Sequence, residues 1–246
     1  MELPIEFPLA SPLHNNIAAF FAMVFYYRMA IEFTSWLRIR FKFGECRYVL
    51  HMMFSSLVIF WPFFDCSDWS WRLNALVPAV VASRLLFKGA LTSDPNDPDV
   101  QNMATKLSTS PTNLLFGPLQ FACLMVWLGL YKFMTVEAAI IIAAVGVGDG
   151  VAPLIGSRYG RHMFQLPWTS LKTMEGTVVG VFLGTIAGMY TYMFMMGIPF
   201  IPLRMVLAYA AIGGVAEATS LSSFDNIVIP VVLHLSIDRV PELLPA

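Results

Sequence analysis

The sequence predicts an all-α, polytopic membrane protein: a bundle of about seven transmembrane helices followed by a short C-terminal hydrophobic segment. Of its 246 residues, 57% are hydrophobic and only 13% are charged, about half the charged share of a soluble domain. The apolar residues form long runs instead of amphipathic stripes, and a run of about 20 crosses a bilayer as a helix. No soluble domain interrupts these runs, so residues 1–246 are expected to form a single integral membrane domain.

Seven apolar runs define the expected spanning helices. They cover residues 14–36, 48–64, 73–91, 113–133, 135–156, 176–197 and 203–221. A shorter stretch, 226–237, is expected to be tilted, re-entrant or completed by its neighbours. Thr92–Thr112, with its Asp-Pro repeats and Ser/Thr cluster, is expected to be a long polar loop.

Charge and cysteine content exclude several classes of protein. The net charge is −1, so no basic field indicates nucleic acid as a partner. The three cysteines are scattered and form neither a disulfide framework nor a zinc spacing. Met1–Asn16 contains Glu2 and Glu6 and no Lys or Arg, unlike a signal or transit peptide. We therefore expect the first helix to be retained, and the endoplasmic reticulum is favoured over a plastid envelope.

The basic residues predict which loops face the cytoplasm. The loops after the first, third and fifth runs carry Arg38, Arg40, Lys42, Arg47, Lys88, Lys106, Arg158, Arg161 and Lys172, whereas the other loops carry only Arg72, Lys132 and Arg204. Because basic loops remain in the cytoplasm, the odd-numbered loops are placed there. By the same parity, the loop after the seventh run, Ser222–Asn226, is also cytoplasmic.

Small residues recur at every fourth position in three late segments. The series are Gly148, Ala152, Gly156 and Gly160; Gly176, Gly180, Gly184 and Gly188; and Ala210, Gly214 and Ala218. This spacing keeps each series on one helix face, where the missing side chains let backbones approach closely. Packing alone explains most of these glycines, and the same packing is expected to draw three polar clusters together.

Those clusters contain the acids that carry the chemical argument. They are Gly146–Arg161 around Asp149, Lys172–Thr177 around Glu175, and Glu217–Pro230 with Glu217, Asp225 and Asn226. A carboxylate within or beside a membrane span costs several kcal/mol unless it is paired or hydrated, and therefore marks a candidate functional site. We expect all three clusters to meet the cytoplasmic membrane surface.

Asp149 lies between Gly148 and Gly150, with Pro153 four residues later. Glycine and proline weaken a helix, so we expect a broken helix whose freed N–H groups bind an anion such as phosphate. A neighbouring carboxylate favours a bridging Mg²⁺ ion. The cations of Arg158, Arg161 and Lys172 would then contact phosphate oxygens. The alternatives are an interhelical hydrogen bond for Asp149 and the positive-inside rule for the two arginines.

Common nucleotide and hydrolase signatures are missing. The chain has no P-loop, and Gly146-x-Gly148-x-Gly150 only weakly resembles a dinucleotide loop, which its membrane context argues against. The histidines suggest no Ser/His/Asp order. His14, His162 and His234 are expected to be structural.

The three clusters resemble the CTP-dependent isoprenoid-alcohol kinases (dolichol, phytol and farnesol kinases), whose superfamily also contains the CDP-diacylglycerol synthases. The similarity to dolichol kinase lies in Val147–Ser157, Lys172–Thr177, Glu217-Ala, Asp225-Asn226 and Pro230, in matching order across about 85 residues. The upstream half looks more like phytol and farnesol kinases: Arg47–His51 resembles their Arg-Lys-x-x-His segment, and Asn113–Leu119 their Glu-Leu-Leu-x-Gly-Pro-Leu. This mixed pattern leaves the chain length of the alcohol open.

The resemblance implies transfer of the γ-phosphoryl group of CTP to the hydroxyl of a membrane isoprenoid alcohol. Asp149 and Asp225 would hold Mg²⁺ and the phosphates, Lys172 would neutralise transferred charge, and Glu175 would position the metal or activate the hydroxyl. The other positions expected at the nucleotide are Gly148, Gly150, Gly156, Arg158, Arg161, Gly176, Thr177 and Asn226, and Glu217 and His51 are assigned to the substrate or to other roles at the site. Positioning and charge stabilisation are what phosphoryl transfer requires.

Three alternatives remain open at this point. A cytidylyltransferase would carry the synthases' Lys-Asp pair and Pro-Gly-His-Gly-Gly segment, which this chain lacks. A CTP-dependent diacylglycerol kinase also resembles the family. A transporter would use the intramembrane acids as ion sites and would show inverted hydropathy repeats, of which none is convincing.

Overall fold

The computed structural model describes residues 11–41, 46–91, 94, 97, 100–101, 110–221 and 224–244. The chain divides into two compact units, Met1–Met134 and Thr135–Ala246. Whether they act as the single domain expected from the sequence stays a prediction. The expected polar loop Thr92–Thr112 lies largely outside the described residues, as do Lys42, Lys106 and the first ten residues of the N-terminal segment.

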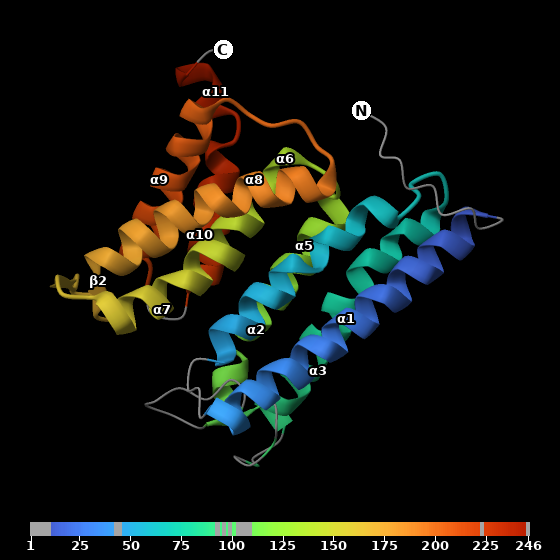
Figure 1. The fold of residues 1–246 in the computed structure, drawn as a ribbon, viewed down its shortest axis with the longest axis horizontal. Helices are drawn as coiled ribbons and strands as arrows, with labels where there is room; N and C mark the ends of the chain where they lie inside the picture. Colours follow the sequence, from blue (N-terminus) through green and yellow to red (C-terminus); the bar gives the residue numbers. More distant parts are fainter. Residues whose placement is uncertain are drawn as a thin grey trace. The chain divides into compact units, whose positions relative to one another are not determined.

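The described part of the first unit is mainly helical (Figure 1). In order, its segments are α1 (Pro12–Phe41), α2 (Cys46–Ser55), η1 (Ser56–Phe63), η2 (Trp69–Ala75), α3 (Leu76–Leu91), η3 (Pro111–Leu114) and α5 (Pro118–Tyr131). Helix α5 begins where Gly117 adopts a φ of 81°, a backbone conformation that glycine tolerates, and Pro118 fits the first helical turn. The Asn16 amide ties α1 to the start of η2 by donating to Asp65 O (3.0 Å) and Ser70 Oγ (2.8 Å).

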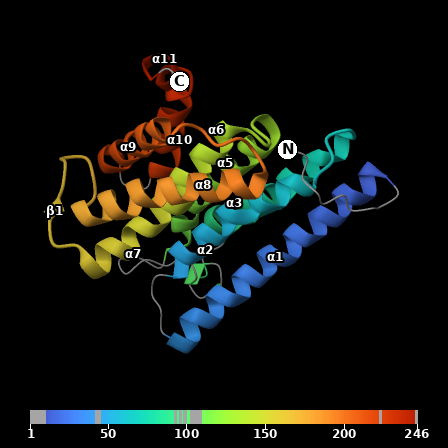
Figure 2. The ribbon, with the colours of Figure 1, turned by 45° about the horizontal axis from the view of Figure 1, so that its top comes forward.

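The second unit contains the three polar clusters. Its segments are α6 (Val136–Ile142), η4 (Ala143–Gly148), α7 (Asp149–Tyr159), β1 (Met163–Phe164), β2 (Lys172–Thr173), η5 (Gly176–Leu183), α8 (Gly184–Met196), α9 (Leu203–Thr219), α10 (Asp225–Ser236) and α11 (Arg239–Leu243). Helices α6 and η4 are almost completely buried and pack against α8 and α10. Helix α7 lies beside η5 and α8, and the β1–β2 hairpin joins α7 to η5 (Figure 2).

The predicted fold class is confirmed. Six helical stretches in the described part of the chain are long and apolar enough to cross a membrane: Pro12–Arg40, Cys46–Phe63, Trp69–Leu91, Pro111–Tyr131, Val136–Tyr159 and Gly176–Met196. They match the first six predicted runs. The seventh run corresponds to α9, whose 17 residues give a length of about 26 Å at 1.5 Å per residue. The predicted short hydrophobic segment is α10, with 12 residues.

The helix around Asp149 is not broken, contrary to the prediction from its glycines and proline. Val136–Tyr159 is one continuous helical stretch, in which Ala143–Gly148 takes a π-helical conformation and Pro153 lies inside α7. A proline lacks the N–H that would bond to the carbonyl one turn earlier, and its ring crowds that carbonyl. The carbonyl that Pro153 leaves without its N–H partner is that of Asp149, in the first turn of α7, and the helix continues through this turn directly after the π segment.

Candidate functional site

Glycines bring α7 and η5 into backbone contact, as the four-residue spacing predicts. A Cβ on Gly180 would collide with the Ala152 backbone, and a Cβ on Gly176 would lie 3.0 Å from Ala152 O. At the deeper end, a Cβ on Gly148 would lie 2.5 Å from Thr185 Oγ1. The helices are therefore antiparallel, and the turn that carries Asp149 is fixed relative to the segment that carries Lys172 and Glu175.

The third small-residue series behaves differently from its prediction. A Cβ on Gly214 would meet nothing within 4 Å, whereas one on the neighbouring Gly213 would lie 3.4 Å from Ala144 Cβ of η4. The face that α9 turns toward η4 is therefore centred one residue earlier. A four-residue spacing identifies a helix face, but the crossing angle decides which residue of that face lies at the contact.

A two-stranded hairpin holds Lys172 at the end of α7. Strands β1 and β2 are antiparallel, with Met163 opposite Thr173 and Phe164 opposite Lys172. Thr173 Oγ1 accepts a hydrogen bond from Gly176 N (3.1 Å), and its side chain contacts Gly156 and Gly160, leaving no space for a Cβ there. Gly156 of α7 and Gly160, which caps its end, thus provide the surface that Thr173 of β2 contacts, a role that the sequence did not suggest for Thr173.

Lys172 belongs to a buried polar group that we call the lysine cluster: Lys172, Thr177, Glu217 and Ser220. Lys172 Nζ lies 2.6 Å from Glu217 Oε1, also donates to the Glu217 carbonyl, and lies 3.4 Å from Ser220 Oγ. Thr177 Oγ1 donates to Glu217 Oε2 (3.2 Å). The Lys172 and Glu217 side chains are only 11% and 9% exposed. A buried ion pair is retained only if good geometry and further hydrogen bonds offset its desolvation, and this cluster supplies both.

Glu175 is engaged by His162 and does not join the lysine cluster in the contacts described. Its Oε1 lies 2.7 Å from His162 Nδ1, and its Oε2 accepts from His162 N (3.3 Å). The backbone N–H of Glu175 itself, and then the His162 side chain, lower the pKa of Glu175 to about 2. A carboxylate with so low a pKa is a weak base. The geometry therefore favours a role in fixing the hairpin over the predicted activation of a hydroxyl.

Asp149 is half-buried at the first position of α7, directly after the π turn. The Gly148–Thr185, Ala152–Gly180 and Gly156–Gly176 contacts place Thr177 beside residue 155 of α7. That level is six residues, or about 9 Å, from Asp149 along the helix axis. Lys172 Nζ and Thr177 Oγ1 both contact the carboxylate of Glu217, so the lysine cluster lies on the hairpin side of the Asp149 turn.

Asp225 and Asn226 begin α10. Asp225 Oδ1 accepts from Asn226 N (3.0 Å). His234 Nδ1 lies 2.5 Å from Glu137 Oε1, which fixes the far end of α10 on α6. Helix α10 also packs against η4, the π turn before Asp149. Because the His234 end of α10 is held at Glu137 of α6, its Asp225 end points toward η4.

The donors at this end suit a hard cation. Asn226 is 6% exposed, and its Oδ1 is buried without a hydrogen-bond partner in the described structure. A buried polar oxygen of this kind is costly unless a ligand or ion satisfies it. No group of three His, Cys, Asp or Glu side chains that could hold a metal occurs in the described residues. Mg²⁺ is commonly held by one or two carboxylates together with substrate phosphates, and the predicted magnesium role of Asp149 and Asp225 stays a prediction.

The two predicted arginines lie at the hairpin end of α7. Arg158 and Arg161 are both exposed, and Arg158 is nine residues, or about 14 Å, from Asp149 along the helix. The two arginines therefore lie beside the hairpin and not beside the Asp149 turn. Of the positions that sequence reasoning did not assign to the site, His162 and Ser220 lie in the sequence beside predicted residues, and only their three-dimensional contacts identify them.

Comparison with known proteins adds an independent observation. Over 186 residues the chain is 26% identical to "Probable phytol kinase 2, chloroplastic" of Oryza sativa subsp. japonica, a match that covers 72% of this chain and 60% of that protein. Over 154 residues it is 29% identical to "Probable phytol kinase 1, chloroplastic" of Glycine max, covering 61% and 49%. The chain is similar to phytol kinases. No family model matches it, and no solved structure does.

The similarity to the phytol kinases involves both units. The chain spans 60% and 49% of the lengths of these two relatives. The second unit, Thr135–Ala246, is shorter than either matched stretch, so each match includes part of the first unit. There, the ring of His51 stacks on Phe121 with centroids 4.0 Å apart, one turn of α2 after Arg47. The predicted substrate role of His51 stays a prediction.

Proposed function

We propose that the chain is a CTP-dependent kinase that transfers the γ-phosphoryl group to the hydroxyl of a membrane isoprenoid alcohol of the phytol, farnesol or dolichol type. The observation that carries the proposal is the buried lysine cluster, held by close helix packing in the same unit as Asp149 and Asp225. The similarity to phytol kinases supports a kinase acting on a prenyl alcohol. The choice of CTP as donor rests on the motif resemblance.

Each residue of the site has a defined task in this proposal. Asp149, Asp225 and the amide oxygen of Asn226 hold Mg²⁺, which when bound neutralises charge on the phosphate oxygens. Lys172 contacts the transferred phosphoryl group, and Glu217 with Thr177 orients its ammonium. The alcohol oxygen forms a bond to the γ-phosphorus while the bond from that phosphorus to the β–γ bridging oxygen breaks. CDP leaves, and the hydroxyl proton passes to solvent.

A single labelling experiment tests the reaction type. The purified protein in lipid nanodiscs is incubated with Mg²⁺ and either γ-labelled or α-labelled CTP, with phytol, farnesol, dolichol, diacylglycerol or phosphatidate added separately. Label from γ-labelled CTP in a prenyl phosphate is the expected result. Label only in phosphatidate would indicate the diacylglycerol kinase, and α-label in a lipid formed from a lipid phosphate would indicate a cytidylyltransferase. No labelled lipid with any alcohol would refute the proposal, and nucleotide-independent solute flux in liposomes would favour a transporter.

A matched pair of variants tests the site. Asp149→Asn should abolish transfer because an amide is a poor ligand for Mg²⁺ compared with a carboxylate. Asp238→Asn changes an exposed aspartate of the same unit and should retain activity. Equal activity in the two variants would contradict the role of Asp149.

The protein is a multi-pass membrane protein, and we propose that the basic loops and the site face the cytoplasm, where CTP is available. Two membranes are candidates. The sequence favours the endoplasmic reticulum, whereas the names of the two relatives point to the chloroplast. Imaging of a fluorescent fusion, together with protease protection of a tag at Asp94 in the expected polar loop Thr92–Thr112, would decide both the compartment and the side.

A further inference from the structure

The hairpin between α7 and η5 exposes large apolar side chains. Met163, Trp168 and Leu171 are 65%, 54% and 60% exposed, although Lys172, the residue directly after Leu171, points inward to the lysine cluster. Successive residues of an extended strand point to opposite sides. Lys172, the first residue of β2, therefore points to the candidate site, whereas Leu171, directly before the strand, points away from it and is exposed.

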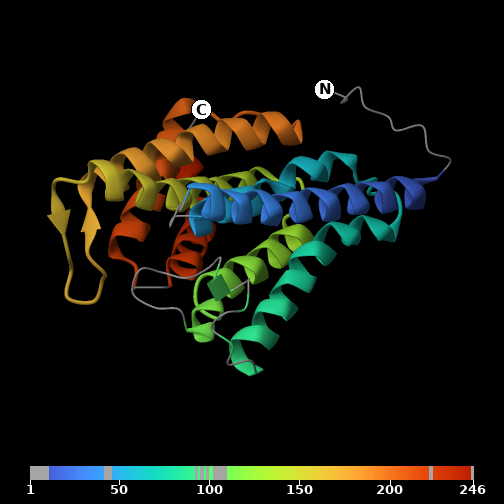
Figure 3. The same ribbon diagram turned by 60° about the horizontal axis from the view of Figure 1, so that its bottom comes forward.

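The position of the hairpin indicates what can cover these side chains. It joins two stretches that are long enough to span a membrane, Val136–Tyr159 and Gly176–Met196, so it lies at the surface where both stretches end. Figure 3 shows it turning away from the axes of these helices. Trp168 Nε1 donates to Thr219 O at the end of α9 (3.0 Å), which holds the tip of the hairpin against another helix end.

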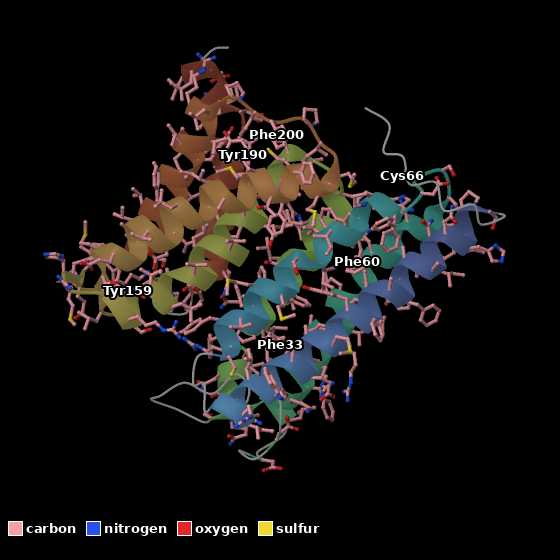
Figure 4. All side chains as sticks on the ribbon, viewed as in Figure 1. Phe33, Phe60, Cys66, Tyr159, Tyr190 and Phe200 are labelled. Atoms are coloured by element: carbon pink, nitrogen blue, oxygen red, sulfur yellow. The ribbon has the colours of Figure 1, made fainter. Side chains whose placement is uncertain are left out.

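The chemistry of this surface matches the boundary between headgroups and acyl chains. Trp and Tyr are enriched at that depth because each has an apolar body and a polar group, and Tyr159, at the end of α7, is 65% exposed (Figure 4). Arg158 and Arg161 are exposed beside the same end of α7, where basic side chains are attracted to anionic headgroups. In water, the apolar surface of Met163, Trp168 and Leu171 would be exposed to solvent with nothing covering it.

We infer that the hairpin, residues 160–175, lies within the headgroup layer of the bilayer, with Met163, Trp168 and Leu171 at the acyl boundary. The hairpin is thus an interfacial anchor that sets the depth of Lys172. If the proposed function holds, this depth is also that of the hydroxyl of a lipid alcohol whose chain remains in the membrane.

Spin labelling tests the depth directly. Cys46, Cys66 and Cys123 are replaced, and nitroxide labels are placed at Met163→Cys, at Leu171→Cys and, as a control, at the exposed polar neighbour Ser170→Cys. In liposomes, labels at 163 and 171 should collide more with oxygen, which concentrates in lipid, and less with a water-soluble nickel chelate. The label at 170 should show a lower ratio of oxygen to nickel collisions. Ratios at 163 and 171 equal to that at 170 would overturn the inference.

Tryptophan fluorescence provides a second test that keeps the native cysteines. Trp168 is one of six tryptophans, and Trp168→Phe should reduce the part of the emission that brominated lipids quench. A variant that instead loses emission quenched by acrylamide in the aqueous phase would place Trp168 in water and refute the anchor. Neither measurement depends on turnover, so a failed kinase assay would leave the depth result intact.

Discussion

Replacing Gly180 by alanine should separate the two helices that carry the site. The new Cβ would lie 2.7 Å from Ala152 N and 2.9 Å from Ala152 Cβ, against ordinary contacts of 3.4 Å or more. Because the backbone of Ala152 cannot rotate away, α7 and η5 must move apart by roughly 1 Å, which forfeits about a quarter to a half of the dispersion energy at the contact. Overpacking of this kind costs about 1–3 kcal/mol.

The chain provides its own control for this prediction. Gly214 is also inside a helix, but a Cβ there would meet nothing within 4 Å. Gly214→Ala should therefore gain about 0.4–1 kcal/mol by restricting the unfolded chain. The same gain applies to Gly180→Ala, so the difference between the two variants isolates the steric term of about 1–3 kcal/mol.

Thermal unfolding followed by tryptophan emission in detergent measures this difference. For a chain of this size, about 1 kcal/mol corresponds to roughly 2–4 °C, so Gly180→Ala should melt several degrees below Gly214→Ala. Kinase turnover should also fall, by up to about 100-fold, because a shift of about 1 Å misaligns reacting groups. Equal melting temperatures and equal turnover in the two variants would refute the close-packing argument.

Three further variants test the charged groups. Glu175→Gln should be less stable than the wild type at neutral pH, because the pKa of Glu175 in the folded protein is about 2, below its ordinary 4.5. The difference in stability should shrink as pH falls from about 5 toward 2. A series of melting temperatures measured at different pH values would reveal this. Asp225→Asn should raise the Mg²⁺ concentration needed for half-maximal turnover, and an unchanged Mg²⁺ titration would remove Asp225 from the metal site. Glu217→Gln should leave the Lys172 ammonium buried without its counterion and cost about 3–5 kcal/mol, measurable as a loss of melting temperature that Lys172→Met in the same chain should largely restore.

The spans were predictable from the sequence because each depends only on a local run of apolar residues of sufficient length. The same holds for the contact between the Gly148 and Gly180 series, since a four-residue spacing defines a helix face without reference to a partner. Helix α9 was harder to judge, because its 17 residues lie at the lower limit for a span.

Other features depended on registers and crossing angles that no local pattern contains. Lys172 and Glu217 are 45 residues apart, and only the crossing of η5 and α9 brings them together. Sequence reasoning included Glu217 among the candidate site residues without a defined role, and it did not predict that this carboxylate pairs with Lys172. Glycine and proline around Asp149 indicated a break because local rules assess each residue separately, whereas the structure accommodates both a π turn and Pro153 within one continuous helical stretch.

The ammonium group of Lys172 has two roles in this proposal, one in stability and one in phosphoryl transfer. For stability, Lys172 must neutralise Glu217, since both side chains are nearly buried. For phosphoryl transfer, the ammonium must also reach a phosphate. An ammonium has three N–H donors, and its described partners are two oxygens of Glu217 and Ser220 Oγ. The contact with Ser220 is long, at 3.4 Å, so the ammonium can bind a phosphate oxygen without leaving Glu217. The donor shared with Ser220 is therefore the one that a phosphate oxygen would take. It follows that the Lys172→Met, Glu217→Gln double variant should recover stability and remain inactive; recovered turnover would mean that Lys172 serves only to balance Glu217.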